Sequence, residues 1–114
     1  MQLARESKHR RFISLILNKW GELYLQWRKW DAALTAFIES HETARKIGVQ
    51  ENIAAALYGM AQVAAAQGNI AQARQQGQES WAVFASIGHI KAAEVKQWLE
   101  ELPLIMNALG EYLH

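Results

Sequence analysis

The sequence has few of the residues that interrupt helices and none of those that form disulfides. Its 114 residues include no cysteine and a single proline, Pro103. Without cysteine the chain has no disulfide and no thiolate metal ligand, which fits a reducing compartment. Alanine, glutamine, leucine and glutamate are plentiful, and proline costs about 3 kcal/mol inside a helix. The composition therefore favours an all-α fold.

Long apolar runs are also missing. No stretch approaches the roughly 18 to 20 apolar residues that a membrane-spanning helix needs. The first residues, Met1–Arg11, are basic and polar, unlike a signal peptide. We therefore expect a soluble, cytoplasmic protein. Because Gln2–Arg11 looks like the tail of a preceding element, we also expect the chain to be part of a longer protein.

The net charge of +1 is spread unevenly along the chain. Residues 1–30 carry seven basic and two acidic side chains, a net of +5, whereas residues 31–114 carry five and nine, a net of −4. This asymmetry can attract an acidic partner, or it can be one solvated helix end. We favour the solvated end.

The chain repeats itself with a period of 40 residues. Shifting the sequence by 40 aligns small or apolar positions, and both copies end in Ile-Gly. Self-similarity at such a period indicates a repeat architecture. The aligned pairs are Ile13 and Ile53, Leu17 and Leu57, Ala33 and Ala73, Glu39 and Glu79, Ile47 and Ile87, and Gly48 and Gly88.

Each repeat divides into two helices. Apolar residues recur at a spacing near 3.6 from Phe12 to Trp27, and Arg28-Lys29 breaks the pattern before Asp31, which can cap or charge the next helix. Gly48 and Gly88 can take the positive φ that ends a helix. The predicted helices are 12–27, 31–47, 51–67, 70–87 and 90–102, followed by a short helix, Leu104–Leu113, that Pro103 opens.

Small residues predict how these helices pack. Gly21 lies in the middle of a helix, where glycine costs roughly 1 kcal/mol relative to alanine, so we expect a neighbouring helix to pass close to it. Its counterpart is Ala61, and Ala33 and Ala73 serve the same purpose on the partner helices. Trp20, Tyr24 and Phe37 then fill the core. The expected result is a stack of helical hairpins.

This pattern resembles the tetratricopeptide repeat family. The family's signature reads here as Leu17, Trp20-Gly21, Tyr24, Ala33 and Phe37, and more weakly as Leu57, Met60-Ala61, Ala64, Ala73 and Gly77. The period of 40 is similar to a longer variety of the repeat, found in C-terminal arrays of bacterial multidomain signalling ATPases and regulators.

The resemblance implies one domain over residues 1–114, folded as a right-handed α-α superhelix of about 2.5 repeats plus a C-terminal helix. The first repeat covers about 12–48, the second about 52–88, and a partial repeat with a capping helix about 90–113.

The resemblance also implies a non-catalytic protein-interaction module, such as a sensing or scaffolding array of a larger regulator. We expect no enzyme activity, cofactor or bound metal. No two of the four histidines stand at metal-ligand spacing, and the adjacent Glu100 and Glu101 point about 100° apart on a helix.

By the family's register, the first helix of each repeat lines a groove that binds a protein or peptide. The predicted partner-binding residues are Asn18, Glu22, Gln26, Tyr58, Gln62 and Trp98, and Leu15, Ala55, Val95 and Leu102 share their register. Amides can pair with a peptide backbone, and aromatic rings can hold its side chains. Since Glu22 occupies the position of a clamp asparagine, we do not expect a C-terminal carboxylate ligand. The alternative for Val95, Trp98 and Leu102 is burial under Leu104–Leu113.

Two other functions remain open. An exposed end of the stack can dock on a second copy to form a homo-oligomer. The basic N-terminal third, with Trp27 and Trp30 beside Arg28-Lys29, can contact nucleic acid or another polyanion. We rank the interaction module first, self-association second and nucleic acid, which we consider unlikely, third.

Overall fold

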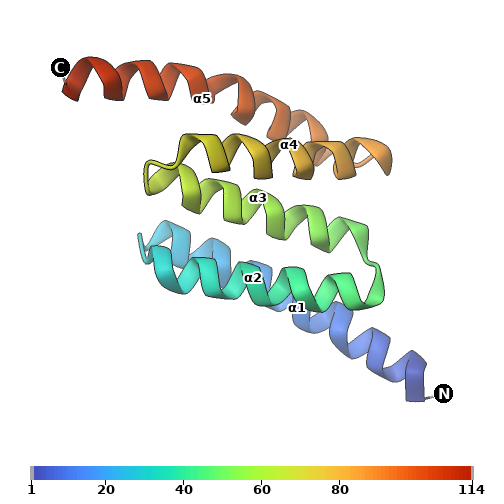
Figure 1. The fold of residues 1–114 in the computed structure, drawn as a ribbon. Helices are drawn as coiled ribbons and strands as arrows, with labels where there is room; N and C mark the ends of the chain where they lie inside the picture. The colour runs from blue at the N-terminus through green and yellow to red at the C-terminus, as the bar shows by residue number, and fades with distance from the viewer. Residues whose placement is uncertain (1, 114) are drawn as a thin grey trace.

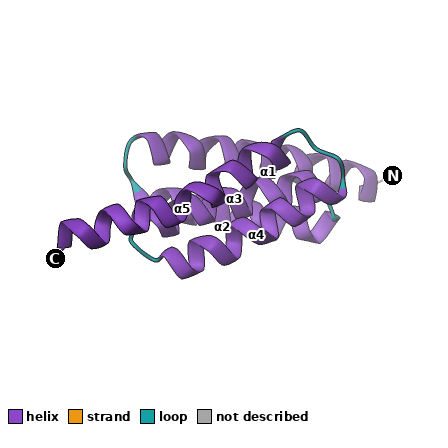
Figure 2. Cartoon of the chain, turned by 90° about the horizontal axis from the view of Figure 1, so that it is seen from above, coloured by secondary structure: helices purple, strands orange, loops and turns teal. Residues whose placement is uncertain are grey.

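Five helices follow one another along the chain, and each packs against the next. The computed structural model describes the backbone of residues 2–113 and the side chains of residues 8–102. The helices are α1 (Gln2–Gln26), α2 (Trp30–Ile47), α3 (Gln50–Ala66), α4 (Ile70–Ser86) and α5 (Lys91–Leu113). They form two stacked antiparallel hairpins with α5 on top (Figure 1). Figure 2 looks along this stack, whose extents are 60 × 29 × 18 Å.

The predicted glycine stops are confirmed. Gly48 has a φ of 69° and its N–H donates to the Arg45 carbonyl at 3.2 Å, and Val49 N–H reaches back to the Ala44 carbonyl at the same distance. Gly88, with a φ of 66°, plays the same part after α4. The left-handed conformation turns the chain and satisfies carbonyls at the helix end.

The hairpin loops differ in detail from the prediction at Asp31. Lys29 occupies the position before α2 and makes no side-chain cap, while Asp31 lies in the first turn, where its charge favours the helix dipole. Arg28 takes a φ of 58°, the left-handed conformation that Gly68 adopts in the second hairpin. Asn69 caps α4 by accepting the Gln72 N–H at 3.2 Å.

The forty-residue period is present in the tertiary structure. The Ser40 hydroxyl donates to the Ser14 carbonyl at 2.8 Å, and the Ser80 hydroxyl donates to the Ala54 carbonyl at the same distance. Both donors are fully buried. Because donors and acceptors are each displaced by 40 residues, the two hairpins are one structural unit used twice.

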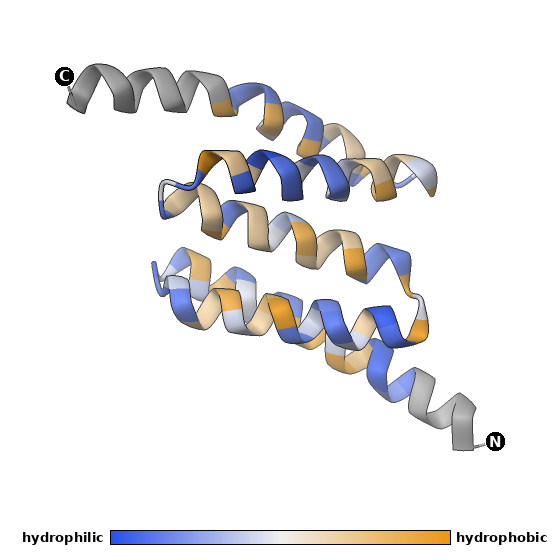
Figure 3. Ribbon diagram, in the orientation of Figure 1, coloured by the Kyte–Doolittle hydropathy of each residue, from blue (hydrophilic) through white to orange (hydrophobic). Residues whose placement is uncertain are grey.

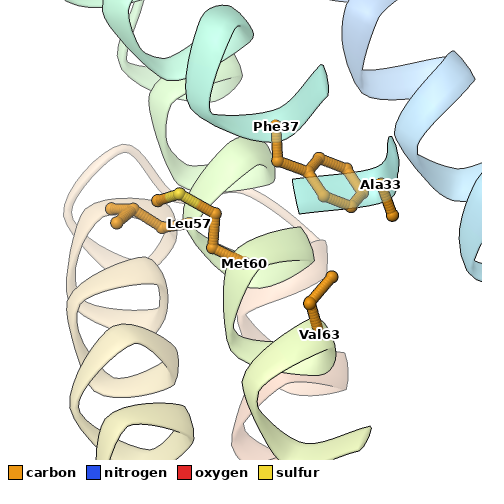
Figure 4. Packing of buried hydrophobic residues seen from close by; sticks show 5 residues of the cluster. All are labelled: Ala33, Phe37, Leu57, Met60 and Val63. Carbon is orange, nitrogen blue, oxygen red and sulfur yellow. The ribbon is translucent and has the colours of Figure 1, made fainter. Parts of the chain in front are cut away.

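Phe37 lies at the centre of the first hairpin's contact with α3. It belongs to a buried cluster with Ala33, Leu57, Met60 and Val63 (Figure 4). A Cβ on Gly21 would lie 2.5 Å from Phe37 Cε1, and one on Gly59 would be closer still. The close approach predicted at Gly21 is therefore confirmed, and the group that approaches is an aromatic ring.

The second hairpin packs on α5 through a different arrangement. Gly77 of α4 faces Leu99, whose Cδ2 would lie 2.7 Å from a Cβ at that glycine. Val95 is buried with Ala54 and Phe84, and Leu102 is buried with Ala64 and Ala73. Residues of α3 and α4 therefore cover this face of α5.

Two predicted helix boundaries are wrong. α1 begins at Gln2, ten residues before Phe12, because a polar segment without helix breakers can extend a helix that is already nucleated. The predicted helices 90–102 and 104–113 are a single helix, α5, with Pro103 inside it. A proline removes one backbone hydrogen bond, and the helix-favouring residues on both sides continue the helix around it. The contacts of Leu104–Leu113 lie outside the described side chains.

Trp20 does not belong to the core as predicted. Its side chain is 47% exposed and that of Trp27 is 55% exposed, whereas Trp30 packs against the cluster around Phe37. The reason is that the described helices cover α1 on one side only. Figure 3 shows apolar residues on the part of α1 that emerges below α2, and a largely hydrophilic middle of α4. Among the described helices, none is long and apolar enough to cross a membrane.

Candidate functional site

The odd-numbered helices share a hollow of about 290 Å³. α1 contributes Glu22 and Gln26, and α3 contributes Tyr58 and Gln62. These four residues were predicted to line the groove, and the structure brings them together. The rest of the wall is Leu25, Phe37, Ala55, Gly59, Lys91 and Glu94.

A second hollow of about 160 Å³ continues the first. The two share Glu22, Ala55 and Lys91 in their walls, so together they form one groove across α1, α3 and the start of α5. We refer to these two hollows together as the groove. The remaining wall of the second hollow is Leu15, Asn18, Lys19, Glu51, Asn52, Phe84 and His89.

Asn18 lines the second hollow and carries a buried acceptor without a partner in the described part of the chain. Its side chain is 3% exposed, and its Nδ2 donates to the Asn52 carbonyl at 3.3 Å. Asn52 is itself held by α1, since its Nδ2 donates to Ser14 Oγ at 2.7 Å and to the Arg11 carbonyl at 3.2 Å. The Asn18 Oδ1 is buried and has no partner among the described residues. A buried acceptor without a donor costs free energy, which a ligand N–H can recover.

The pKa of Tyr58, in the larger hollow, is raised above that of an ordinary tyrosine. Burial raises its pKa to about 12, and the negative charge and hydrogen-bonding contact of Glu94 act in the same direction. Its ring meets that of Trp98 edge-on, with 5.6 Å between ring centroids. The hydroxyl therefore stays neutral and is available for hydrogen bonds at physiological pH.

Trp98 supports the groove without lining it. It projects from α5 and packs beside Gly77 of α4, where a Cβ would lie 2.9 Å from Trp98 Cζ3. Val95 and Leu102 are fully buried against α3 and α4, so they do not share the groove register that was predicted for them. The alternative cover for these residues, Leu104–Leu113, lies outside the described side chains.

His89, Lys91 and Glu94 were not among the predicted groove residues, and they close the groove at the start of α5. The Lys91 N–H donates to His89 Nδ1 at 3.1 Å, so the ring proton lies on Nε2, which faces Glu51 Oε1 at 3.1 Å. His89 thereby links the start of α5 to α3. The forty-residue period could have identified Lys91. Lys91 is the counterpart of Glu51, and both residues line the second hollow.

The charges of the groove are mixed. Glu22 and Glu94 oppose Lys91, and Glu22 also pairs with Lys19 at 3.6 Å across an exposed turn. In the part of the chain whose side chains are described, no three His, Asp or Glu residues come together as a cation site would require. The arrangement offers hydrogen bonds and short-range ion pairs.

The comparisons with known proteins agree with this architecture. The tetratricopeptide repeat family model matches residues 12–86, well over half of the chain. Neither the comparison with curated proteins nor that with solved structures gives a significant match. The matched segment holds both hairpins and the equivalent serine hydrogen bonds that relate them. By its sequence and by the packing of its helices, the chain belongs to the tetratricopeptide repeat family.

Proposed function

We propose that the chain binds an extended segment of a partner protein along the groove between α1, α3 and α5. Tetratricopeptide repeats generally mediate protein–protein interaction. The observation that supports this groove is the buried Asn18 Oδ1, which belongs to a residue of the groove wall and has no donor among the described residues. When the Asn18 side chain turns toward the hollow, a backbone N–H of an extended peptide supplies the missing donor.

The other groove residues suit a peptide for the same reason. A peptide in extended conformation exposes one N–H and one C=O at every residue, and these must be paired when they are buried. Gln26 and Gln62 carry both a donor and an acceptor, and they line the larger hollow from α1 and α3. Tyr58, one turn before Gln62 on α3, adds an aromatic face for a side chain of the partner.

The mixed charges of the groove contribute more to the choice of partner than to the affinity for it. Glu22 and Glu94 favour a basic side chain of the partner in the larger hollow, and Lys91 favours an acidic one near its boundary with the smaller hollow. Charge pairs at the rim of an interface mainly set register and association rate. A partner segment with a basic and an acidic residue a few positions apart fits this pattern.

We further propose that this module serves the sensing or scaffolding array of a larger regulator. Its support is the forty-residue period, which is present in the serine hydrogen bonds and resembles the longer variety of the repeat. Within such an array, the module acts by holding a partner.

Selection from a displayed library of random peptides tests the groove. We expect selected peptides to bind the wild-type chain and to bind a Gln26→Ala, Gln62→Ala variant at least tenfold more weakly, a change of about 1.4 kcal/mol. The matched control is Gln75→Ala, Gln78→Ala, which removes two exposed glutamines from α4, away from the groove.

Fluorescence polarisation of a labelled peptide gives the affinities, and circular dichroism checks that both variants are folded. Peptides that bind both variants as tightly as the wild type would place the binding surface elsewhere. A selection without any binder would count against peptide recognition.

A further inference from the structure

α1 carries an apolar face that no described helix covers. Six large side chains repeat at three- and four-residue steps over about four turns of the helix, and they are 39–62% exposed. They are Phe12, Ile13, Ile16, Trp20, Leu23 and Trp27. Monomeric proteins rarely expose contiguous apolar surface of this extent without a partner for it. We refer to these six residues as the α1 face.

The second repeat indicates what the α1 face is built for. Four of the residues 40 positions further along are buried in α3, and Met60 and Val63 among them pack on α2. These four positions are therefore interior in the second repeat and exposed in the first, whereas Ile53 is half-buried and Gln67, the counterpart of Trp27, is exposed. The buried counterparts of Phe12, Ile16, Trp20 and Leu23 are Asn52, Ala56, Met60 and Val63.

Five of the six residues of the α1 face are also larger than their counterparts, and Ile13 is matched by Ile53. Phe12 stands where the second repeat has Asn52, and Trp20 stands where it has Met60. A helix packed as closely as α2 packs on α3 needs small residues, whereas large ones suit a wider interface between separate chains. Tryptophan and phenylalanine are the residues that anchor such interfaces.

We propose that the α1 face is the interface of a symmetric dimer, in which a second copy of this chain covers it. Three aromatic side chains of about 150–250 Å² each, roughly half exposed, supply about 300 Å² per copy. With the three aliphatic side chains the face reaches roughly 500 Å², so two copies bury about 1,000 Å² in total, the lower bound of a specific interface.

At the opposite end of the stack, the described part of α5 exposes polar side chains, among them Lys96, Gln97 and Glu100. Stacking copies head to tail would place this polar surface on the α1 face and leave apolar area unpaired. A two-fold arrangement instead pairs the α1 face with itself, and it closes after two copies.

The surroundings of the α1 face are complementary in charge. A hollow of about 490 Å³ beside it lies between Trp20 and Tyr24 of α1 and the acidic Asp31 and Glu39 of α2. α1 itself carries exposed basic residues, among them Arg11 and Lys19. In a symmetric pair each copy can therefore place basic side chains of α1 near the acidic hollow of the other.

Sedimentation equilibrium tests the dimer with the intact chain. The expected mass is twice the 12.9 kDa of one chain at micromolar concentrations. A Phe12→Gln, Trp27→Gln variant changes the two most exposed members of the α1 face, so it should fold, and we expect its dissociation constant to rise at least tenfold. Ile90→Gln is the matched control, because Ile90 is 87% exposed at the other end of the stack and should leave the dimer unchanged.

Disulfide cross-linking provides a second test that does not depend on destabilising the interface. The chain contains no cysteine, so single-cysteine variants report unambiguously. Trp20 lies in the middle of the α1 face, where a two-fold axis brings the two copies closest. We expect Trp20→Cys to form linked dimers under mild oxidation far faster than Ile90→Cys at the same concentration.

Several outcomes would overturn the proposal. A wild-type chain that stays at 12.9 kDa up to about 1 mM leaves the α1 face free for a different partner. Assembly that grows beyond two copies indicates head-to-tail contacts, and equal effects of the α1 and Ile90 variants place the interface elsewhere.

Discussion

The ring of Phe37 occupies the space that a side chain at Gly59 would fill. One repeat later the relationship is reversed. Gly77 stands at the position of Phe37, and Leu99, at the position of Gly59, fills the space above it. The α2–α3 and α4–α5 contacts therefore use the same two positions with the large and the small residue exchanged.

This relationship predicts that Gly59→Ala destabilises the protein. Alanine at an interior helix position would by itself add about 1 kcal/mol of stability. The new Cβ, however, meets the Phe37 ring, and overpacking of this kind costs about 1–3 kcal/mol or more. We expect a net loss in the free energy of unfolding, measured by urea denaturation.

A double-mutant cycle with Phe37→Leu separates the two effects. The smaller side chain should accept the alanine, so the double variant should lose less than the sum of the single changes, by at least about 0.5 kcal/mol. Strict additivity would mean that Phe37 does not set the requirement for glycine at position 59.

The equivalent buried serines should contribute equally to stability. Ser40→Ala and Ser80→Ala each remove one buried hydrogen bond of 2.8 Å to a backbone carbonyl, and we expect each to cost about 1 kcal/mol. Thr43→Ala removes an exposed bond of the same length to the Glu39 carbonyl and should change stability by less than about 0.5 kcal/mol. Clearly unequal losses at Ser40 and Ser80 would show that the two hairpins are not energetically equivalent.

Tyr58 should titrate well above an ordinary tyrosine. Its pKa of about 12 follows first from burial and then from the charge of Glu94. Ultraviolet absorbance of phenolate, compared with a Tyr58→Phe control, reports this titration. Glu94→Gln should lower the pKa while leaving the effect of burial, and an unchanged pKa would remove Glu94 as a cause.

The same shift makes stability depend on pH at the alkaline end. Because the folded pKa lies above the unfolded value of 10.0, the folded state holds the phenolic proton more tightly. The contribution is complete below pH 10 and is lost as the pH rises toward 12. The stability of the wild type relative to Tyr58→Phe should fall across this window, and a rise would contradict the sign.

His89 should fasten α5 to the rest of the stack. Its Nδ1 accepts the Lys91 N–H, and its Nε2 faces Glu51 of α3. His89→Ala removes both contacts, so we expect faster amide hydrogen exchange in residues 91–102, with an opening free energy lower by about 1 kcal/mol. Exchange in α1 and α2 serves as the internal control and should not change. Exchange that rises equally in all helices would indicate global destabilisation.

Sequence patterns were sufficient to predict the helical hairpins, but not to predict which residues make the contacts between them. The period of 40, the stops at Gly48 and Gly88 and the close approach at Gly21 follow from spacing and from the properties of glycine. Trp20 was misplaced because periodicity identifies an apolar stripe without identifying which part of it another helix covers. Pro103 was misread because a boundary signal was given more weight than the helix-favouring residues on either side.

For the groove, the structure brings together the residues that the family register selects on α1 and α3, but not those that it selects on α5. Glu22, Gln26, Tyr58 and Gln62 line one hollow, as predicted. Extending the register by 40 selected Val95 and Leu102, which are buried. A shift of 40 residues finds equivalent positions in the sequence, but it does not find how α5 packs. Leu99 of α5 packs against Gly77. With α5 in this position, Lys91 and Glu94 are the residues that line the groove.

The sequence by itself determined that this protein is a stack of repeated helical hairpins, because helix propensity, apolar spacing and glycine stops act over short distances along the chain. The tertiary structure decided which apolar residues are core, which end of the stack keeps an open apolar face, and how α5 completes the groove. These features depend on contacts between helices far apart in sequence, where an exchange of one large and one small residue decides which side of a helix is buried.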